Sequence, residues 1–179
     1  MSYSVSVIFR SRDARVPAML RRMPPLAGLP ISVETVRSLH DRRGPVHGGS
    51  FLRERRIALD CTRAEFPRIF VHEVAHFIWL RLGNGGRLTY EDVLRAELAQ
   101  RARGELGWSA EWRKDALQPH DIARRSRRWR EYCCESFCDT AAWLYSGVPV
   151  HAEFTLAQRW SRHRKSWFSG ALGGRTLSI

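Results

Sequence analysis

Two histidines and a glutamate lie within five residues of one another in the run Ile69–Ile78, which reads IFVHEVAHFI. His72 and His76 are four residues apart, so on an α-helix they share one face and stand one turn from each other. Neutral imidazoles in that arrangement can present two nitrogens to a single zinc ion. Glu73 is then placed to act as general base on a water held by the metal. The spacing therefore predicts a zinc site with a hydrolytic function.

The residues around this motif are almost all apolar, which indicates that the helix is buried nearly all round. Buried polar side chains are costly without partners, and a metal ion would be the partner of both histidines. A chance HExxH in a core helix is the alternative interpretation. The helix is expected to run from about Glu65 to Leu82, with Pro67 in its first turn and the run Gly83–Gly86 as its stop.

A second pair of acidic residues lies on a later segment that is predicted to be one helix from Asp121 to Tyr145. Glu135 and Asp139 are four residues apart and share a face of that helix. A catalytic zinc site needs a third protein ligand besides the histidines, and a carboxylate such as Glu135 supplies it. Asp139, one turn further on, can accept the other N–H of a ligating histidine and fix its tautomer.

The order HExxH followed by ExxxD on a downstream helix resembles the gluzincin metallopeptidases, of which thermolysin is a member. The resemblance implies zinc as the cofactor and a peptide or protein as the substrate. It assigns the ligand role to His72, His76 and Glu135. It makes Glu73 the base and places Asp139 behind a ligating histidine. A second resemblance is to ImmA/IrrE-like peptidases, which are small cytoplasmic proteins with HExxH and a downstream glutamate.

Several other residues stay open as participants in the site. A long spacer between the two motifs is expected to form one helix from Thr89 to about Arg103 and another from Ser109 to near Pro119. Competing third ligands are Glu91, Asp92 and Glu97. Two cysteines of the second motif helix share a face and either bind metal or pack as small apolar residues; they are Cys134 and Cys138. Gluzincins usually add a donor for the oxyanion; the candidates are Tyr145, His151, Arg162 and His163.

The remaining elements complete an expected fold of the α+β class. It is zincin-like, with a small, mostly antiparallel N-terminal sheet packed on a helical body that carries the HExxH and ExxxD helices. The expected strands are Tyr3–Arg10, Ile31–Leu39 and Phe51–Asp60, the last of which forms the rim of the cleft. The expected flanking helices are Asp13–Arg22 and Glu153–Phe168, followed by a loose tail from Gly170.

Length and composition favour one folded unit. A chain of 179 residues with 44% hydrophobic residues is expected to form a single zincin-like metallopeptidase domain, residues 1–179. Its start lacks the basic and apolar regions of a signal peptide, and it has no run of about 20 apolar residues that would span a bilayer. We therefore expect a cytoplasmic protein that does not bind membranes. Its four cysteines are expected to be reduced.

The net charge of +12 predicts weak attraction of polyanions. Two arginine-rich runs, Arg124–Arg130 and Arg159–Lys165, are interpreted as solvated helix faces or as a nucleic-acid surface. Two other functions thus remain open: a zincin-fold protein that binds metal without peptidase activity, and a basic nucleic-acid-binding protein with an incidental HExxH. Strand alternation places Arg53 and Arg55 on one face of the predicted rim strand. If that face meets the cleft, we expect a preference for acidic peptides.

Overall fold

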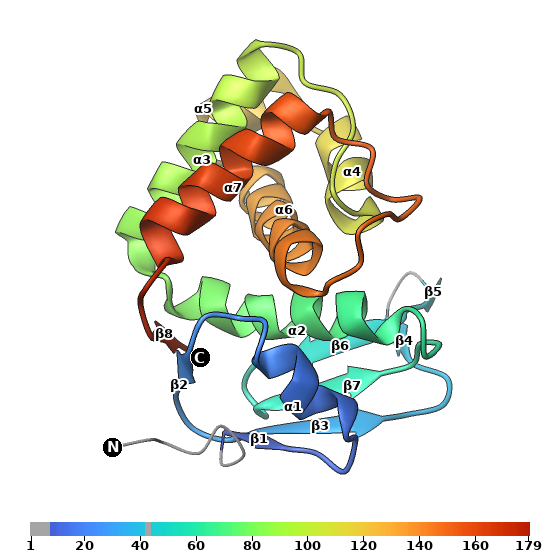
Figure 1. Cartoon of the computed structure of the whole chain (residues 1–179). Coiled ribbons are helices and arrows are strands. Elements are labelled where there is room, and N and C mark those ends of the chain that lie inside the picture. The colour runs from blue at the N-terminus through green and yellow to red at the C-terminus, as the bar shows by residue number, and fades with distance from the viewer. Residues whose placement is uncertain (1–7, 42–43) are drawn as a thin grey trace.

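A computed structural model describes residues 8–41 and 44–179 of the chain (Figure 1). Within these two stretches the chain forms seven helices and eight short strands. This mixture of helices and strands agrees with the predicted α+β class. Helix α2 (Phe66–Arg81) lies between a four-stranded sheet on one side and the other large helices on the other side (Figure 1). This central helix carries the HExxH motif.

The four-stranded sheet differs from the prediction in the direction of its strands. Its order is β1 (Phe9–Arg10), β3 (Ile31–Thr35), β7 (Arg56–Leu59) and β6 (Gly48–Phe51). The pairs β1–β3 and β3–β7 are parallel and the pair β6–β7 is antiparallel, so the prediction of a mostly antiparallel sheet is wrong. The cause is connectivity: helix α1 (Arg15–Leu20) returns the chain between β1 and β3, whereas a short turn joins β6 to β7.

The predicted rim strand is also wrong as a single strand. The segment Phe51–Asp60 is interrupted by a turn at residues 52–55, where Arg55 has a positive φ of 51°. The edge of the sheet is instead β6, most of which precedes the predicted rim segment. Glycine is disfavoured in isolated strands, but pairing with β7 overrides that tendency. The predicted strand Tyr3–Arg10 is described at its end only, as β1, because residues 1–7 lie outside the described residues.

Two smaller sheets hold further segments of the chain, among them the C-terminal tail. Strands β4 (His40–Asp41) and β5 (Gly44–Pro45) are antiparallel, and β2 (Leu26–Ala27) is parallel to β8 (Leu177–Ser178). The prediction of a loose C-terminal tail is therefore wrong. Leu177 and Ile179 are buried, so the tail is held by apolar contacts as well as by strand pairing.

The predicted HExxH helix is confirmed, because α2 matches its expected bounds within one residue at each end. The glycine run after it acts differently from the prediction. Gly83 has a positive φ of 74° and turns the chain, and α3 (Gly83–Ala99) begins at once, so the rest of the run is helical. The Arg87 guanidinium donates hydrogen bonds to the main-chain oxygens of Trp79 and Leu80, which stabilises the C-terminal end of α2.

The helix predicted from Asp121 to Tyr145 is broken in two. Helix α5 (Pro119–Ala123) ends before a turn in which Arg125 has a φ of 47°, and α6 (Arg127–Tyr145) follows. Ser126 is the N-cap of α6: its hydroxyl accepts a hydrogen bond from the Trp129 N–H at 3.3 Å and donates one to Asp121 at 2.6 Å. The second motif helix therefore starts six residues later than predicted.

The remaining helices surround α6 (Figure 1). They are α3, α4 (Trp108–Asp115) and α7 (Gln158–Leu172), the last of which begins and ends later than its predicted bounds. Aromatic rings of Tyr90, Phe137 and Phe168 fill the space between α3, α6 and α7, and all three are buried. None of the helices in the described stretches is both long and apolar enough to span a lipid bilayer.

Candidate metal centre

Helices α2 and α6 pack directly against each other, and their two motifs meet at a cleft of about 730 Å³. All five residues that the sequence singled out line this cleft: His72, Glu73, His76, Glu135 and Asp139. The cleft is also lined by residues of the edge strand β6 and of helix α4. Segments far apart in the chain thus bring the predicted site residues to one place.

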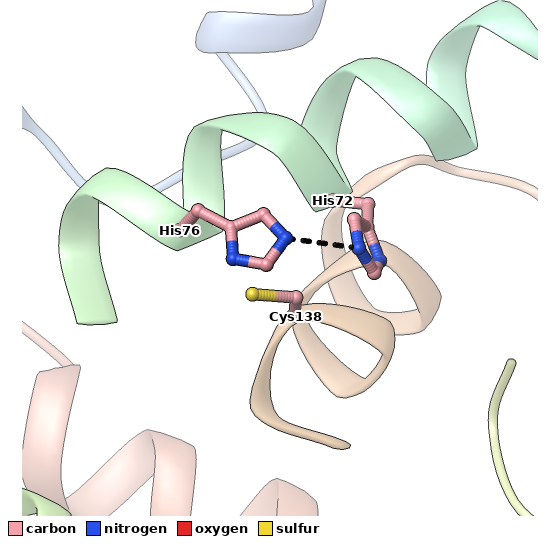
Figure 2. Close-up of side chains that lie close together, drawn as sticks. All are labelled: His72, His76 and Cys138. Atoms are coloured by element: carbon pink, nitrogen blue, oxygen red, sulfur yellow. Dashed lines mark hydrogen bonds between the residues drawn. The ribbon is translucent and has the colours of Figure 1, made fainter. Parts of the chain in front are cut away.

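The two histidines face each other across the distance that one metal ion would bridge. The Nε2 atoms of His72 and His76 are 3.2 Å apart (Figure 2). Glu135 Oε2 lies 3.3 Å from the same Nε2 of His72. Two ligands that each bind one zinc ion at about 2.1 Å with a tetrahedral angle lie about 3.4 Å apart. The spacing of the two histidine nitrogens therefore fits two ligands of one zinc ion, and the Glu135 carboxylate lies beside one of them, His72.

Asp139 binds the Nδ1 side of the His72 ring, opposite His76. The Nδ1–H of His72 donates to Asp139 Oδ1 at 2.7 Å, so the Nε2 atom of the same ring faces His76 and Glu135. The other oxygen of Asp139 accepts a hydrogen bond from the Ala110 main-chain N–H at 3.0 Å. A side chain at Gly107 would not fit, since its Cβ would lie 2.2 Å from the Asp139 carboxyl carbon. The carboxylate is thus fixed by α4 as well as by its own helix.

Replacing Asp139 by asparagine is expected to weaken zinc binding by about 10–100-fold, the usual cost of removing the partner behind a histidine ligand. The neutral amide stabilises the Nδ1–H of His72 less than a carboxylate does. Zinc affinity is measured by competition with a chromogenic chelator, with Asp92→Asn, at an exposed position of α3, as the control. Equal affinities of Asp139→Asn and the parent protein would remove Asp139 from this role.

A cationic residue that the sequence did not indicate completes the site. The Arg113 guanidinium lies 3.2 Å from Glu135 Oε1, which leaves Oε2 on the side of the histidines. Burial raises the pKa of Glu135, but its hydrogen bond to His72 and the nearby charges of His76 and Arg113 outweigh this effect and lower the pKa to about 2. Glu135 is therefore ionised at neutral pH.

Three acidic side chains and a positively charged histidine lie together at the cleft. Burial favours the neutral form of His72, but the Asp139 carboxylate outweighs burial and holds the pKa of His72 well above its ordinary value. When Glu73, Glu135 and Asp139 are ionised, they contribute three negative charges. When no metal is bound, the protonated His72 imidazole and the Arg113 guanidinium offset two of these charges, and a bound zinc ion would take the place of the His72 proton.

The edge strand β6 holds the predicted base. The Ser50 hydroxyl lies 2.6 Å from Glu73 Oε2 and 2.8 Å from the Glu73 main-chain oxygen, both of which are acceptors. Gly48 leaves room for the same carboxylate, because a Cβ there would lie 2.6 Å from Glu73 Oε1. Neither residue was predicted as part of the site. The only sequence signal was the Gly-Gly-Ser run itself, which is ordinary in loops.

A thiol lies on the buried side of the histidines. Potential ligand atoms of His72, His76 and Cys138 all lie within 4.8 Å of one another (Figure 2). Cys138 is completely buried, and burial holds its thiol pKa well above the ordinary value, which disfavours the thiolate that binds metal. Glu135, in contrast, is ionised and lines the open cleft. Cys134 Sγ lies 3.5 Å from His76 Nδ1, on the other edge of that ring.

The competing third ligands have other partners. Glu91 accepts hydrogen bonds from Arg125 and from the Trp129 indole, and Glu97 is paired with the buried Arg164. Asp92 is exposed and paired with Arg95 at 3.0 Å. These contacts place the three acidic residues away from the two histidines, in structural ion pairs.

The candidates for the oxyanion donor also lie elsewhere. Tyr145 packs against Phe168 in the core, and His151 is paired with Glu65 at 3.0 Å. The last two candidates, Arg162 and His163, are exposed on α7. Arg113 lines the cleft and carries a cationic donor 3.2 Å from Glu135.

Comparisons with known proteins add no relative: no protein-family model, curated protein or solved structure matches this chain. The assignment of the site therefore stands on the geometry of its own residues.

The expected preference for acidic peptides loses its structural basis. Arg53 and Arg55 lie in the turn between β6 and β7, where strand alternation does not apply. Arg55 donates hydrogen bonds to the main-chain oxygens of Leu29 and Pro30 and so is directed at the N-terminal segment. The arginine run on α7 is not simply a solvated face either, because Arg164 is completely buried.

Proposed function

We propose that this protein is a zinc-dependent peptidase with His72, His76 and Glu135 as ligands. The observation that carries the proposal is that His72 Nε2 lies 3.2 Å from His76 Nε2 and 3.3 Å from Glu135 Oε2 in an open cleft. Two further features support it: Asp139 stands behind His72, and a carboxylate suited to act as base, Glu73, lines the same cleft. The proposal includes the gluzincin-type, zincin-like arrangement of the two motif helices.

A bound zinc ion would supply a Lewis acid that polarises the peptide carbonyl and makes a water molecule more acidic. Glu73 takes the proton from the attacking water and passes it to the leaving amine as the peptide bond breaks. Ser50 keeps the Glu73 carboxylate oriented during this transfer through its 2.6 Å hydrogen bond. Arg113 and Asp139 hold Glu135 and His72 in place.

The edge strand β6 offers a way to bind an extended peptide. The Asp60 N–H donates to the His47 oxygen, so His47 and Asp60 are a hydrogen-bonded pair of the antiparallel ladder. Such pairs alternate along a strand with pairs that are not hydrogen-bonded. The main-chain N–H and C=O groups of Gly48 and Ser50 therefore point away from β7. An extended substrate can add to this edge as a further strand, with its backbone hydrogen-bonded to these two residues. Because Ser50 also contacts Glu73, such a strand lies next to the proposed base.

The proposal is tested by measuring metal content and peptide hydrolysis together. Purified protein is expected to contain about one zinc ion per chain, to lose it on His72→Ala, and to lose hydrolysis of a broad peptide library on treatment with a chelator. His120→Ala is the matched control, because His120 is exposed on α5. Protein without bound zinc, when purified in its presence, would contradict the proposal.

The position of Cys138 favours a second candidate, a metal-binding protein without peptidase activity. A zinc ion held by His72, His76 and Cys138 would use a completely buried thiol in place of the carboxylate that lines the cleft. Stoichiometric zinc without hydrolysis of any library peptide, together with loss of zinc on Cys138→Ala but not on Glu135→Ala, would favour this candidate over the first.

A further inference from the structure

Helix α4 is fastened to the proposed metal centre at several points. The Ala110 N–H donates to Asp139, and the Arg113 guanidinium contacts Glu135. At the start of α4, the Trp108 N–H donates to Glu153 Oε2 at 2.9 Å, and Glu153 is held in turn by Arg68. The side chains that α4 presents to the cleft therefore have a fixed position relative to the metal ligands.

Two of those side chains are exposed tryptophans. Trp108 is 64% exposed and Trp112 is 42% exposed, and both line the cleft. In the described part of the chain, six large hydrophobic side chains are exposed, and these two are its aromatic members. Exposed apolar surface gathered at a cleft is typical of a binding site rather than of chance exposure.

The two tryptophans lie one helical turn apart on α4, so both rings can contact one side chain of a bound peptide. Trp108 and Trp112 are four residues apart, so they stand on one face of α4, about 6 Å apart along the helix axis. The Arg113 guanidinium lies over the Trp112 ring at 4.1 Å from its centre, which steadies this ring while much of it stays exposed. Aromatic pairs prefer offset-stacked or edge-to-face contacts with centroids about 4.5–7 Å apart.

We infer that Trp108 and Trp112 form a recognition site for one aromatic side chain of the peptide that the cleft binds. This inference rests on the proposed function, because it takes the occupant of the cleft to be a peptide paired with β6. The substrate class changes accordingly, from the acidic peptides expected from Arg53 and Arg55 to peptides with an aromatic residue near the cleaved bond.

The test measures binding without turnover. Zinc-loaded Glu73→Gln protein is titrated calorimetrically with peptides that differ at one position, which carries phenylalanine, cyclohexylalanine or glycine, and that position is moved along the peptide. At one position, phenylalanine is expected to bind about 10–100-fold more tightly than glycine. It is also expected to bind several-fold more tightly than cyclohexylalanine, which has similar apolar area but no aromatic ring.

Trp108→Ala and Trp112→Ala, each made in the Glu73→Gln protein, are expected to lose most of this preference. Leu88→Ala, at another exposed hydrophobic side chain, is the control and should keep it. Equal binding of the phenylalanine and glycine peptides overturns the inference. So does equal binding of phenylalanine and cyclohexylalanine, or a preference that survives in the double tryptophan variant. Peptide binding is measured separately from hydrolysis, so the two proposals can fail independently. If the parent protein does not hydrolyse peptides, the proposed function is contradicted and the inference about binding is not.

Discussion

Replacing Glu73 by glutamine is expected to reduce peptide hydrolysis by about 10²–10⁴-fold, while the protein keeps its zinc and its fold. General-base catalysis typically contributes about 10²–10⁴-fold, and the amide of glutamine cannot take a proton from the attacking water. Glutamine retains the shape of glutamate, so the contacts of Glu73 with Ser50 and Gly48 survive in outline. The loss should appear in kcat, because the substituted group acts on the reacting atoms.

The measurement compares kcat, zinc content and thermal unfolding of Glu73→Gln with those of the parent protein. Glu131→Gln is the matched control, since Glu131 is on the surface of α6 and paired with Arg127. Its kcat should be unchanged. Comparable turnover by Glu73→Gln and the parent protein would exclude Glu73 as the base, even if the metal site itself is correct.

Replacing Arg164 by methionine is expected to lower the free energy of unfolding by about 3–5 kcal/mol, the usual cost of breaking a buried ion pair from one side. The Arg164 side chain is completely buried between two buried carboxylates, Glu97 and Glu105, with shortest distances of 2.6 Å to each. Burial raises the pKa of Glu105, but the charge of Arg164 outweighs it and holds that pKa below the ordinary value. Methionine fills a similar volume but leaves both carboxylates without this counter-charge.

The free energy of unfolding is measured by urea denaturation, followed by tryptophan fluorescence. Arg162→Met, an exposed arginine on the same helix, is the control and should change it by less than about 0.5 kcal/mol. Adding Glu97→Gln and Glu105→Gln to Arg164→Met should recover part of the loss, because the uncompensated charges are then removed. A loss below about 1 kcal/mol in the single variant would contradict this account.

The ion pairs around Arg164 also connect to the site. Glu105 accepts a hydrogen bond from the Tyr132 hydroxyl on α6 at 2.7 Å and lies 3.2 Å from Lys114 Nζ on α4. These contacts join α4, α6 and α7. The position of α4, and with it of Arg113, thus depends on a buried charge network that lies outside the cleft.

The residues of the candidate site could be found from the sequence because their spacing is local. Positions four apart share a face on any helix, so His72 with His76, and Glu135 with Asp139, are paired by helix geometry alone. The bounds of α2 followed from its apolar run and its flanking proline and glycine. For the same reason, the expectation that this helix is buried nearly all round agrees with the structure.

Contacts between distant segments decided the rest. Ser50, Gly107 and Arg113 touch the site only because β6 and α4 pack beside α2 and α6, and nothing in their own neighbourhood of the sequence marks them. The direction of the strands depends on how the chain crosses between them, which residue patterns do not encode.

What the sequence by itself determined is therefore which donors stand on one helix face. Their spacing in space, with nitrogens 3.2 Å apart and a carboxylate oxygen 3.3 Å away, was decided by the tertiary structure. The physical reason is that a metal-binding geometry is set to a fraction of an ångström by packing and hydrogen bonds from several elements, whereas a helical repeat sets only which side chains share a side.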